Sequence, residues 1–359
     1  MQRQRQADDF INAADSSVKK PPLGGPQTTM CLGIATVERP DEQYVRPAFG
    51  SLMEGLTDEE RKHIHTVVLI GHTDPQQHPI YHETWLENTA DKVLTYDTSN
   101  TTQFDLLVKW EKDKDYRRKA IYDYTYLLET CIQSGAAWIT MVEDDTLAVR
   151  GWYSRAMAAL DVADSKSTDW LYLRLFFTEK FFGWNAEFWP TYLLSSVLLI
   201  IAVAVLLLAL RRLRSHTLIS NWLILTACFV YTPAFILLYF MAGKLSMRPL
   251  PPGVHEMPNY GCCAQGMVFS SPVAARVVDK LRQKEVGFVD MILEAWANEE
   301  KLTRFAVVPS LLQHIGGHSS KGDDFTPAQP MSVAETIFNF GFELYEQRGE
   351  HDIHPTING

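Results

Sequence analysis

Two long stretches without a charged residue constrain this chain more than any other feature. Residues 191–210 carry no charge over 20 positions, and residues 218–241 carry none over 24. A helix needs about 20 mostly apolar residues to cross the hydrocarbon core of a bilayer. The alternative is a pair of buried core helices, but two successive charge-free helices of this length are unusual in soluble proteins. The sequence therefore predicts a transmembrane hairpin, with a kink at Pro233 in its second helix.

The segment between the two spans predicts how the hairpin is oriented. It contains Arg211, Arg212, Arg214 and His216, and short loops rich in Lys and Arg stay on the cytoplasmic side. Residues 1–190 and 242–359, which flank the hairpin, are then both expected in the lumen or outside the cell. Because the first 30 residues contain no apolar run, this topology implies a further anchor upstream; the alternative is an inverted topology.

The overall charge argues against nucleic acid as a partner. The chain has 33 basic and 43 acidic residues, a net charge of -10, whereas general nucleic-acid binders neutralise phosphates with an excess of Lys and Arg. We therefore expect no nucleic-acid partner.

The five cysteines carry weaker information. Cys228 lies in the second span, and the other four allow three pairings into two bridges. An equally good interpretation is that some are buried thiols. These four are Cys31, Cys131, Cys262 and Cys263.

The flanks of the hairpin alternate between strand-like and helix-like patterns. Apolar runs bounded by Gly, Pro or polar residues predict strands, and apolar residues at helical spacing predict helices. Strands are expected within 28–40, 63–75, 91–97, 138–146, 261–271 and 304–320, and helices within 115–134, 272–283 and 288–298. This alternation predicts an α/β fold whose sheet is at least partly parallel.

Neither flank contains enough elements for a complete α/β domain. The simplest interpretation is one domain interrupted by the hairpin, since an insertion requires only that its two ends lie close together. The expected parts are a polar tail (1–28), the two halves of the domain (29–190 and 242–330), the hairpin between them (191–241) and a C-terminal segment (331–359).

The acidic triplet Glu143-Asp144-Asp145 is the sharpest chemical signal. Three adjacent acids after a buried strand are costly unless a cation or water satisfies them. Open α/β sheets bind ligands at the carboxyl ends of their strands, and carboxylate oxygens there suit Mg²⁺ or Mn²⁺. The alternative is a solvated turn.

Three further clusters are individually weak. The basic residues 117–119, near the start of a helix, could hold a diphosphate or form a solvated face. Asp290 and Glu294 share one helix face, where one could be a general base or both could face water. His314 and His318 flank a Gly-rich loop and could bind a metal or phosphate, although a lone His is usually structural.

Together, and in this order, the clusters resemble a glycosyltransferase of the GT-A fold. Segments 114–145, 173–182 and 308–320 resemble the branching N-acetylglucosaminyltransferases that extend N-glycans. The EDD motif before an inserted hairpin, followed by QHIGGHSS, is similar to a related group, the Golgi post-GPI-attachment GalNAc-transferases. This resemblance implies a GT-A-like α/β domain interrupted by a two-helix transmembrane hairpin, which adds GalNAc to the first mannose of GPI anchors.

The resemblance also implies roles for individual residues. Glu143 and Asp145 would be the outer members of a metal motif, with Asp144 between them, holding Mn²⁺ (or Mg²⁺) against the diphosphate of a UDP-sugar. Asp290 would be the base of an inverting reaction, with Glu294 in reserve. The remaining implied positions are Thr36, Val37 and Arg39 near the uridine, Arg118 and Lys119 at the diphosphate, Gly266 in a loop near donor or acceptor, and His314 or His318 at the metal and phosphate.

By the same resemblance, the acceptor is the glycan of GPI-anchored proteins. The protein would be a multi-pass Golgi membrane protein with a lumenal catalytic domain. Two alternatives remain open at this point. One is a membrane-bound transferase acting on N-glycans or glycolipids, and the other is a non-enzymatic membrane adaptor.

Overall fold

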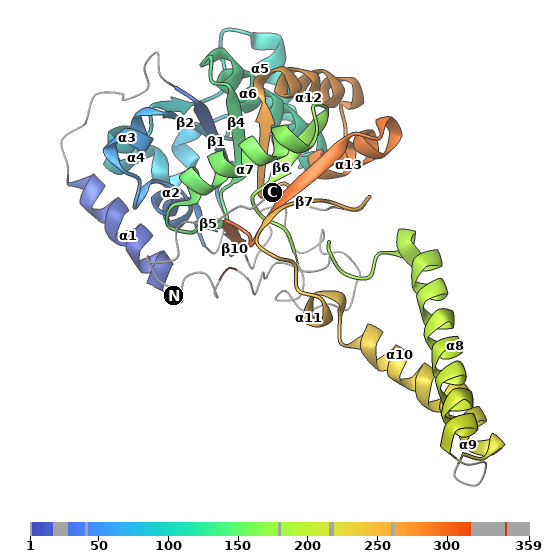
Figure 1. Cartoon of the computed structure of the whole chain (residues 1–359). Coiled ribbons are helices and arrows are strands. Elements are labelled where there is room, and N and C mark those ends of the chain that lie inside the picture. Colours follow the sequence, from blue (N-terminus) through green and yellow to red (C-terminus); the bar gives the residue numbers. More distant parts are fainter. Residues whose placement is uncertain are drawn as a thin grey trace. The chain divides into compact units, whose positions relative to one another are not determined.

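The computed structural model describes residues 2–16, 28–39, 42–178, 181–214, 219–259, 261, 263–316 and 342 (Figure 1). The chain divides into two compact units. The larger unit contains Met1–Thr178, Pro252–Met257 and Gly261–Gly359, and the smaller contains Glu179–Pro251 and Pro258–Tyr260. In sequence, the smaller unit is therefore an insertion into the larger one.

The larger unit is built on an eight-stranded mixed sheet in the order β3-β2-β1-β4-β8-β6-β9-β7. Strands β1 to β4 are parallel, β8 is antiparallel to both of its neighbours, and β7 is antiparallel to β9. The bounds are β1 Met30–Thr36, β2 Ile64–Ile70, β3 Lys92–Leu94, β4 Trp138–Glu143, β6 Trp170–Arg174, β7 Gly253–Glu256, β8 Gly266–Ser270 and β9 Thr303–Val308. Since β8 lies between β4 and β6, both flanks of the insertion build one sheet. The expected α/β fold with a partly parallel sheet is confirmed.

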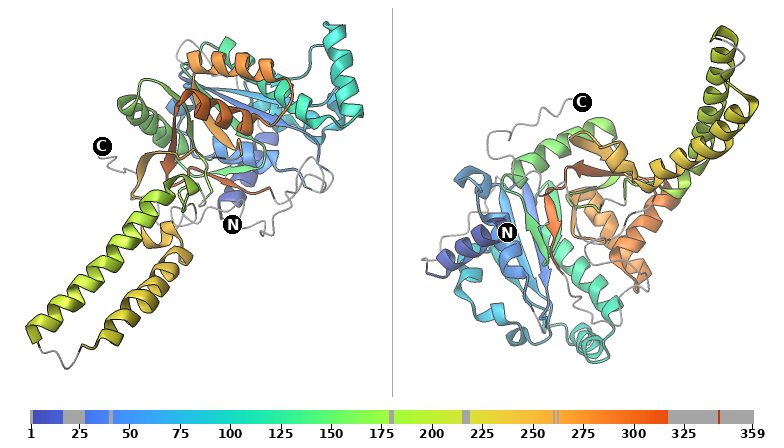
Figure 2. Two further views of the ribbon diagram at one scale, coloured as in Figure 1. Left: turned by 90° about the vertical axis from the view of Figure 1, so that its right-hand side faces the viewer. Right: turned by 90° about the horizontal axis from the view of Figure 1, so that it is seen from below.

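Helices cover both faces of this sheet (Figures 1 and 2). Along β1, Met30, Leu32 and Ile34 enter the core shared with the helices on one face. Gly33 faces the other side, where a Cβ would lie 3.1 Å from the Leu127 side chain. The first face carries α2 Val45–Met53 and α7 Trp152–Lys166, and the second carries α6 Tyr116–Gln133, α12 Ser271–Lys284 and α13 Val289–Glu300, with α5 Thr101–Lys112 packed on α6.

A disulfide joins β1 to α6. Among the pairings left open by the sequence, the structure shows Cys31–Cys131, which closes a separation of 100 residues. Both cysteines are fully buried. Such a link limits the conformations of the unfolded chain, and native disulfides typically contribute about 2–5 kcal/mol.

We expect the double variant Cys31→Ala/Cys131→Ala to lose about 2–5 kcal/mol of unfolding free energy. Denaturant unfolding of the full chain in detergent measures this loss. Reduced wild-type protein is the control and should show a similar loss. Unchanged stability in the double variant would contradict the structural role of the bridge.

The N-terminal residues, expected as a polar tail, contain a docked helix, α1 (Gln2–Asp15). Its buried residues are spaced to face α2, and Ala7 and Ile11 are fully buried. The approach is close, because a Cβ on Gly50 would lie 2.5 Å from the Ala7 carbonyl oxygen. Arg3 is also buried; its guanidinium pairs with Glu54 and donates to the Ala148 carbonyl over 2.7 Å.

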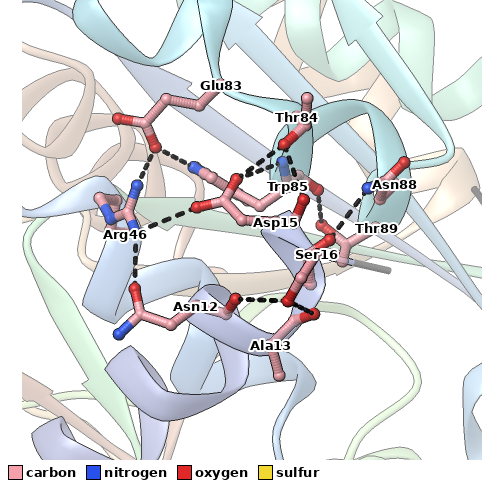
Figure 3. Close-up of polar contacts among 11 residues, drawn as sticks. Asn12, Ala13, Asp15, Ser16, Arg46, Glu83, Thr84, Trp85, Asn88 and Thr89 are labelled. Atoms are coloured by element: carbon pink, nitrogen blue, oxygen red, sulfur yellow. Dashed lines mark hydrogen bonds and ion pairs between the residues drawn. The ribbon is translucent and has the colours of Figure 1, made fainter. Parts of the chain in front are cut away.

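The end of α1 is fastened to α4 (Thr84–Thr89) by polar contacts (Figure 3). The Asp15 carboxylate accepts from the Trp85 backbone N–H at 2.9 Å and from the Thr84 hydroxyl at 3.0 Å. Arg46 lies 3.6 Å from the same carboxylate, and Asn88 donates to the last turn of α1. The Asp15 carboxylate thus accepts from the Trp85 N–H, one of the backbone donors that have no partner within the first turn of α4.

The smaller unit contains two antiparallel apolar helices (Figures 1 and 2). The first is α8 (Trp189–Arg214); the second runs through α9 (Asn221–Thr226), a π-helical turn (Ala227–Tyr231) and α10 (Thr232–Met241). Both are long and apolar enough to cross a membrane, and almost none of their side chains are buried within the protein. The π-helical turn ends two residues before Pro233, where the sequence predicted a kink. The Thr232 hydroxyl donates there to the Ala227 carbonyl at 2.8 Å.

Candidate active site at the carboxyl end of the sheet

The candidate site residues gather at one edge of the sheet. Strand β8 is antiparallel to both β4 and β6, so β1, β4 and β6 run in the same direction. Their last residues, Thr36, Glu143 and Arg174, therefore lie at the same edge as Gly266, which begins β8 and pairs with Val142. This is the edge where open α/β sheets bind ligands.

The turn after β4 buries two of the three acids. Asp144 and Asp145 are only 5% and 7% exposed. The Thr36 hydroxyl donates to Asp144 Oδ2 at 2.7 Å, and Arg39 pairs with Asp144 Oδ1 and lies 3.2 Å from Asp145 Oδ2. The acids are thus arranged around a buried guanidinium, rather than forming a solvated turn.

The two acids differ in their electrostatic environment. Burial, reinforced by the charge of Asp145, raises the pKa of Asp144, although Arg39 opposes the shift. Burial also acts to raise the pKa of Asp145, but His314 and Arg39 outweigh it, and the net shift is downward. Asp145 is therefore the better-stabilised anion.

His314 reaches Asp145 through a second, two-stranded sheet. Strand β10 (Leu312–His314) pairs antiparallel with β5 (Thr146–Ala148), which follows the acidic turn. His314 Nε2 lies 3.2 Å from Asp145 Oδ2, and the chain then passes so close that a Cβ on Gly316 would lie 2.4 Å from this oxygen. The structure places His314 beside Asp145, whereas His318 lies outside the described residues.

Two buried atoms at this point lack partners within the described part of the chain: Asp145 Oδ1 and His314 Nδ1. Buried polar atoms without partners are rare in proteins, and a bound water or ion is one way in which such atoms are satisfied. In the described ranges, no three His, Cys, Asp or Glu side chains form a ready-made metal cluster. The arrangement still fits Mg²⁺ or Mn²⁺, because proteins often bind Mg²⁺ through one or two carboxylates plus substrate phosphates.

The basic residues at the start of α6 separate into two environments. Lys119 is buried and donates to the Gly71 carbonyl, to Asp123 at 3.1 Å and to the Tyr96 hydroxyl at 2.7 Å. Gly71 directly follows β2, so Lys119 lies at the same edge of the sheet as the acids. The half-exposed Arg118 instead pairs with Asp115, the N-cap of its own helix, at 2.6 Å.

Two histidines at this edge were missed by the sequence analysis. His72 follows β2, accepts from the Glu38 N–H at 2.8 Å and lies 2.9 Å from Glu111. Burial acts to raise the pKa of Glu111, but hydrogen bonds from His72 and Thr73 outweigh it and lower the pKa to about 2. The position of His72 at the end of a strand could have identified it as a candidate site residue from the sequence.

His78 is fully buried behind Thr36 and belongs to no sequence motif. Val37 lies close to Gly71, where a Cβ would be 3.1 Å from the Val37 side chain.

Asp290 and Glu294 lie on α13 but have different environments. Asp290 Oδ2 accepts from the Cys263 N–H at 2.6 Å. Within the described residues, its other oxygen makes no hydrogen bond. The charges of Asp290 and Glu143 both raise the pKa of the buried Tyr124 phenol, after the larger effect of burial. Both carboxylates therefore lie within electrostatic range of the Tyr124 phenol.

Both carboxylate oxygens of Glu294 are engaged. Oε1 accepts from Tyr172 and lies 2.7 Å from Arg174 Nη2, and Oε2 lies 2.5 Å from Arg304 Nη1. Glu294 is buried, and a Cβ on Gly261 would lie 2.5 Å from Oε1. This carboxylate ties α13 to β6 and β9. Gly266 also has a packing role, because a Cβ there would lie 2.4 Å from Leu312.

The α/β sheet thus carries a buried acidic turn with basic and histidine side chains at the carboxyl ends of its strands, which is where such sheets bind ligands. A comparison with known protein families then identifies the class of enzyme to which the chain belongs. The family model described as GPI-N-acetylgalactosamine transferase PGAP4 matches residues 30–313, a range that includes the acidic turn and the inserted helices and ends within β10. The chain belongs to this family and is therefore a glycosyltransferase, which confirms the resemblance seen in the sequence and excludes the adaptor alternative.

Proposed function

We propose that this chain transfers GalNAc from UDP-GalNAc to the mannose core of GPI anchors, using a GT-A-like site. The observation that carries the proposal is the buried turn Asp144-Asp145, where Asp145 Oδ1 has no partner in the described residues. The family supports a GPI GalNAc-transferase, and a glycosyltransferase of this kind takes a nucleotide-sugar donor.

Glu143 and Asp145 would hold Mn²⁺ or Mg²⁺, with His314 beside Asp145. When bound, the cation neutralises charge that develops on the departing diphosphate. Asp144 has a different task, because Thr36 and Arg39 engage both of its oxygens. It fixes the position of Arg39, whose guanidinium lies close to Asp145.

The base in this proposal is Asp290. It accepts the proton of the attacking mannose hydroxyl as the new bond to the anomeric carbon forms and the bond to the diphosphate breaks with inversion. Glu294 is a poor candidate, because three donors already engage its oxygens. The Cys263 N–H orients the Asp290 carboxylate and leaves its second oxygen available for a substrate proton.

A donor panel tests this proposal. Purified full-length protein in detergent is given a series of UDP-sugars with Mn²⁺, Mg²⁺ or EDTA, and release of UDP is measured. We expect hydrolysis of UDP-GalNAc above that of the other donors, with loss in EDTA and recovery on adding Mn²⁺. Activity that persists in EDTA would refute the metal role of the acidic turn, and preference for another sugar would refute the donor assignment.

We further propose that the inserted helices cross the Golgi membrane and that the larger unit is lumenal. The two spans, Ala186–Leu213 and Asn221–Met241, expose their apolar side chains, which is unfavourable in water and favourable in lipid. Arg211 and Arg212 near their connection favour a cytoplasmic loop. The disulfide Cys31–Cys131 supports an oxidising compartment for the larger unit.

The inserted helices are expected to matter for the acceptor more than for the donor. A GPI anchor keeps its mannose close to the bilayer, so a domain fixed to the membrane meets that acceptor at the right height. We expect a variant with residues 191–241 replaced by a short soluble linker to keep UDP-sugar hydrolysis but lose transfer to GPI proteins in vesicles. A lipid-free GPI glycan is the control acceptor and should still be used. Equal transfer to vesicle-bound acceptors by both proteins would contradict this role.

A further inference from the structure

The fully buried His78 lies directly behind the acidic turn. It connects two short 3-10 turns, Pro75–Gln77 and Pro79–His82, and its side chain has no exposed surface. A buried polar ring is costly unless its nitrogens are satisfied. The contacts that satisfy this ring also determine which nitrogen carries its proton.

The hydrogen bonds fix the tautomer of the His78 ring. They also fix the direction of donation along a short chain that runs from His78 through Thr36 to Asp144. The Ile80 backbone N–H donates to His78 Nδ1 at 3.3 Å, so the proton of the neutral ring lies on Nε2. Nε2 lies 3.0 Å from the Thr36 hydroxyl oxygen. The single proton of that hydroxyl points to Asp144 Oδ2, 2.7 Å away.

The ring remains neutral at physiological pH. Burial, assisted by the charge of His72, lowers the pKa of His78 to about 4. His78 is therefore a fixed donor, and it does not change charge in the range where the enzyme works.

We propose that His78 is a positioning residue for the transfer reaction, and this inference rests on the function proposed above. Its Nε2–H turns the Thr36 hydroxyl toward Asp144, and Asp144 in turn holds Arg39 beside Asp145. With the donor to Thr36 removed, the hydroxyl can rotate away from Asp144. The Arg39 guanidinium then loses one of its two fixed carboxylates, and the carboxylate of Asp145 is presented to the donor less accurately.

Two amide substitutions separate this role from general packing. In His78→Asn, the amide can replace the acceptor for Ile80 but is too short to reach Thr36. In His78→Gln, the amide N–H₂ can reach the position of Nε2. We expect His78→Asn to lower kcat for UDP-sugar hydrolysis about 10- to 100-fold with little change in KM, in the range for misplaced catalytic groups. His78→Gln should recover at least about a third of wild-type kcat.

Substitutions at Thr36 provide a second test of the same proposal. Thr36→Val removes the hydroxyl and should match the loss in His78→Asn, while Thr36→Ser retains the donor and should keep most activity. Because both residues act through one chain, Thr36→Val/His78→Asn should be no worse than the poorer single variant. His63→Asn, at the opposite end of β2, is the control and should be as active as wild type.

Thermal unfolding of every variant is measured alongside kcat, and kcat is expressed per folded enzyme. The proposal is overturned if His78→Asn and His78→Gln are equally active, if the losses in Thr36→Val and His78→Asn multiply, or if the loss follows stability alone. These outcomes differ from failure of the proposed function, in which wild-type protein itself would hydrolyse no UDP-sugar.

Discussion

Replacing Asp145 by Asn is expected to lower kcat for UDP-sugar hydrolysis and for transfer by at least about 100-fold. The carboxylate is buried, is held as an anion by His314 and Arg39, and has one oxygen without a partner in the described residues. Removing its charge weakens the stabilisation of the departing diphosphate, and groups that act on developing charge contribute about 10²–10³ in rate.

The measurement is UDP release as a function of donor and Mn²⁺ concentration. The apparent affinity for Mn²⁺ should fall together with kcat. Asp58→Asn is a matched control, because it makes the same chemical change on the surface of α3 (Asp58–Lys62), which has no buried residues. Wild-type Mn²⁺ dependence in Asp145→Asn would exclude this residue from the metal site.

Replacing Asp290 by Asn is expected to lower kcat for transfer by about 10²–10⁴, the usual contribution of a general base. The amide keeps the shape of the carboxylate and can still accept from the Cys263 N–H. It cannot take the proton of the acceptor hydroxyl. Binding of the donor should remain close to wild type.

Glu294→Gln provides the contrast on the same face of α13. Glu294 pairs with Arg174 and Arg304 in the protein interior, and breaking a buried pair typically costs about 3–5 kcal/mol. We therefore expect Glu294→Gln to reduce stability and yield, with most activity retained per folded molecule. Stable, inactive Glu294→Gln together with active Asp290→Asn would reverse the assignment.

Much of the framework could be predicted from the sequence because it follows local patterns. The apolar runs at β1, β2 and β4 matched strands to within a few residues, and helical spacing located α6. Placement of the acidic turn at the ligand edge follows from strand direction alone. The sequence named His314 or His318 for the metal and phosphate without choosing between them, and the contact of His314 with Asp145 is seen only in the structure.

Other features depend on contacts between distant segments. Helix α1 has few apolar residues, and its docking depends on a buried Arg3, which no amphipathic pattern indicates. Asp290 and Glu294 share a helix face, but Arg174 and Arg304 from two strands engage only Glu294. His78 belongs to no motif, and its relation to Asp144 exists only through Thr36.

The central claim is tested most directly by transfer to a GPI acceptor. Full-length protein in vesicles is incubated with UDP-GalNAc, Mn²⁺ and a GPI-anchored protein, and the released GPI glycan is analysed by mass spectrometry. The account predicts a gain of one N-acetylhexosamine on mannose, which is lost in EDTA and in both Asp145→Asn and Asp290→Asn. A GPI glycan left unmodified by active enzyme, with the sugar found on N-glycans instead, would contradict it.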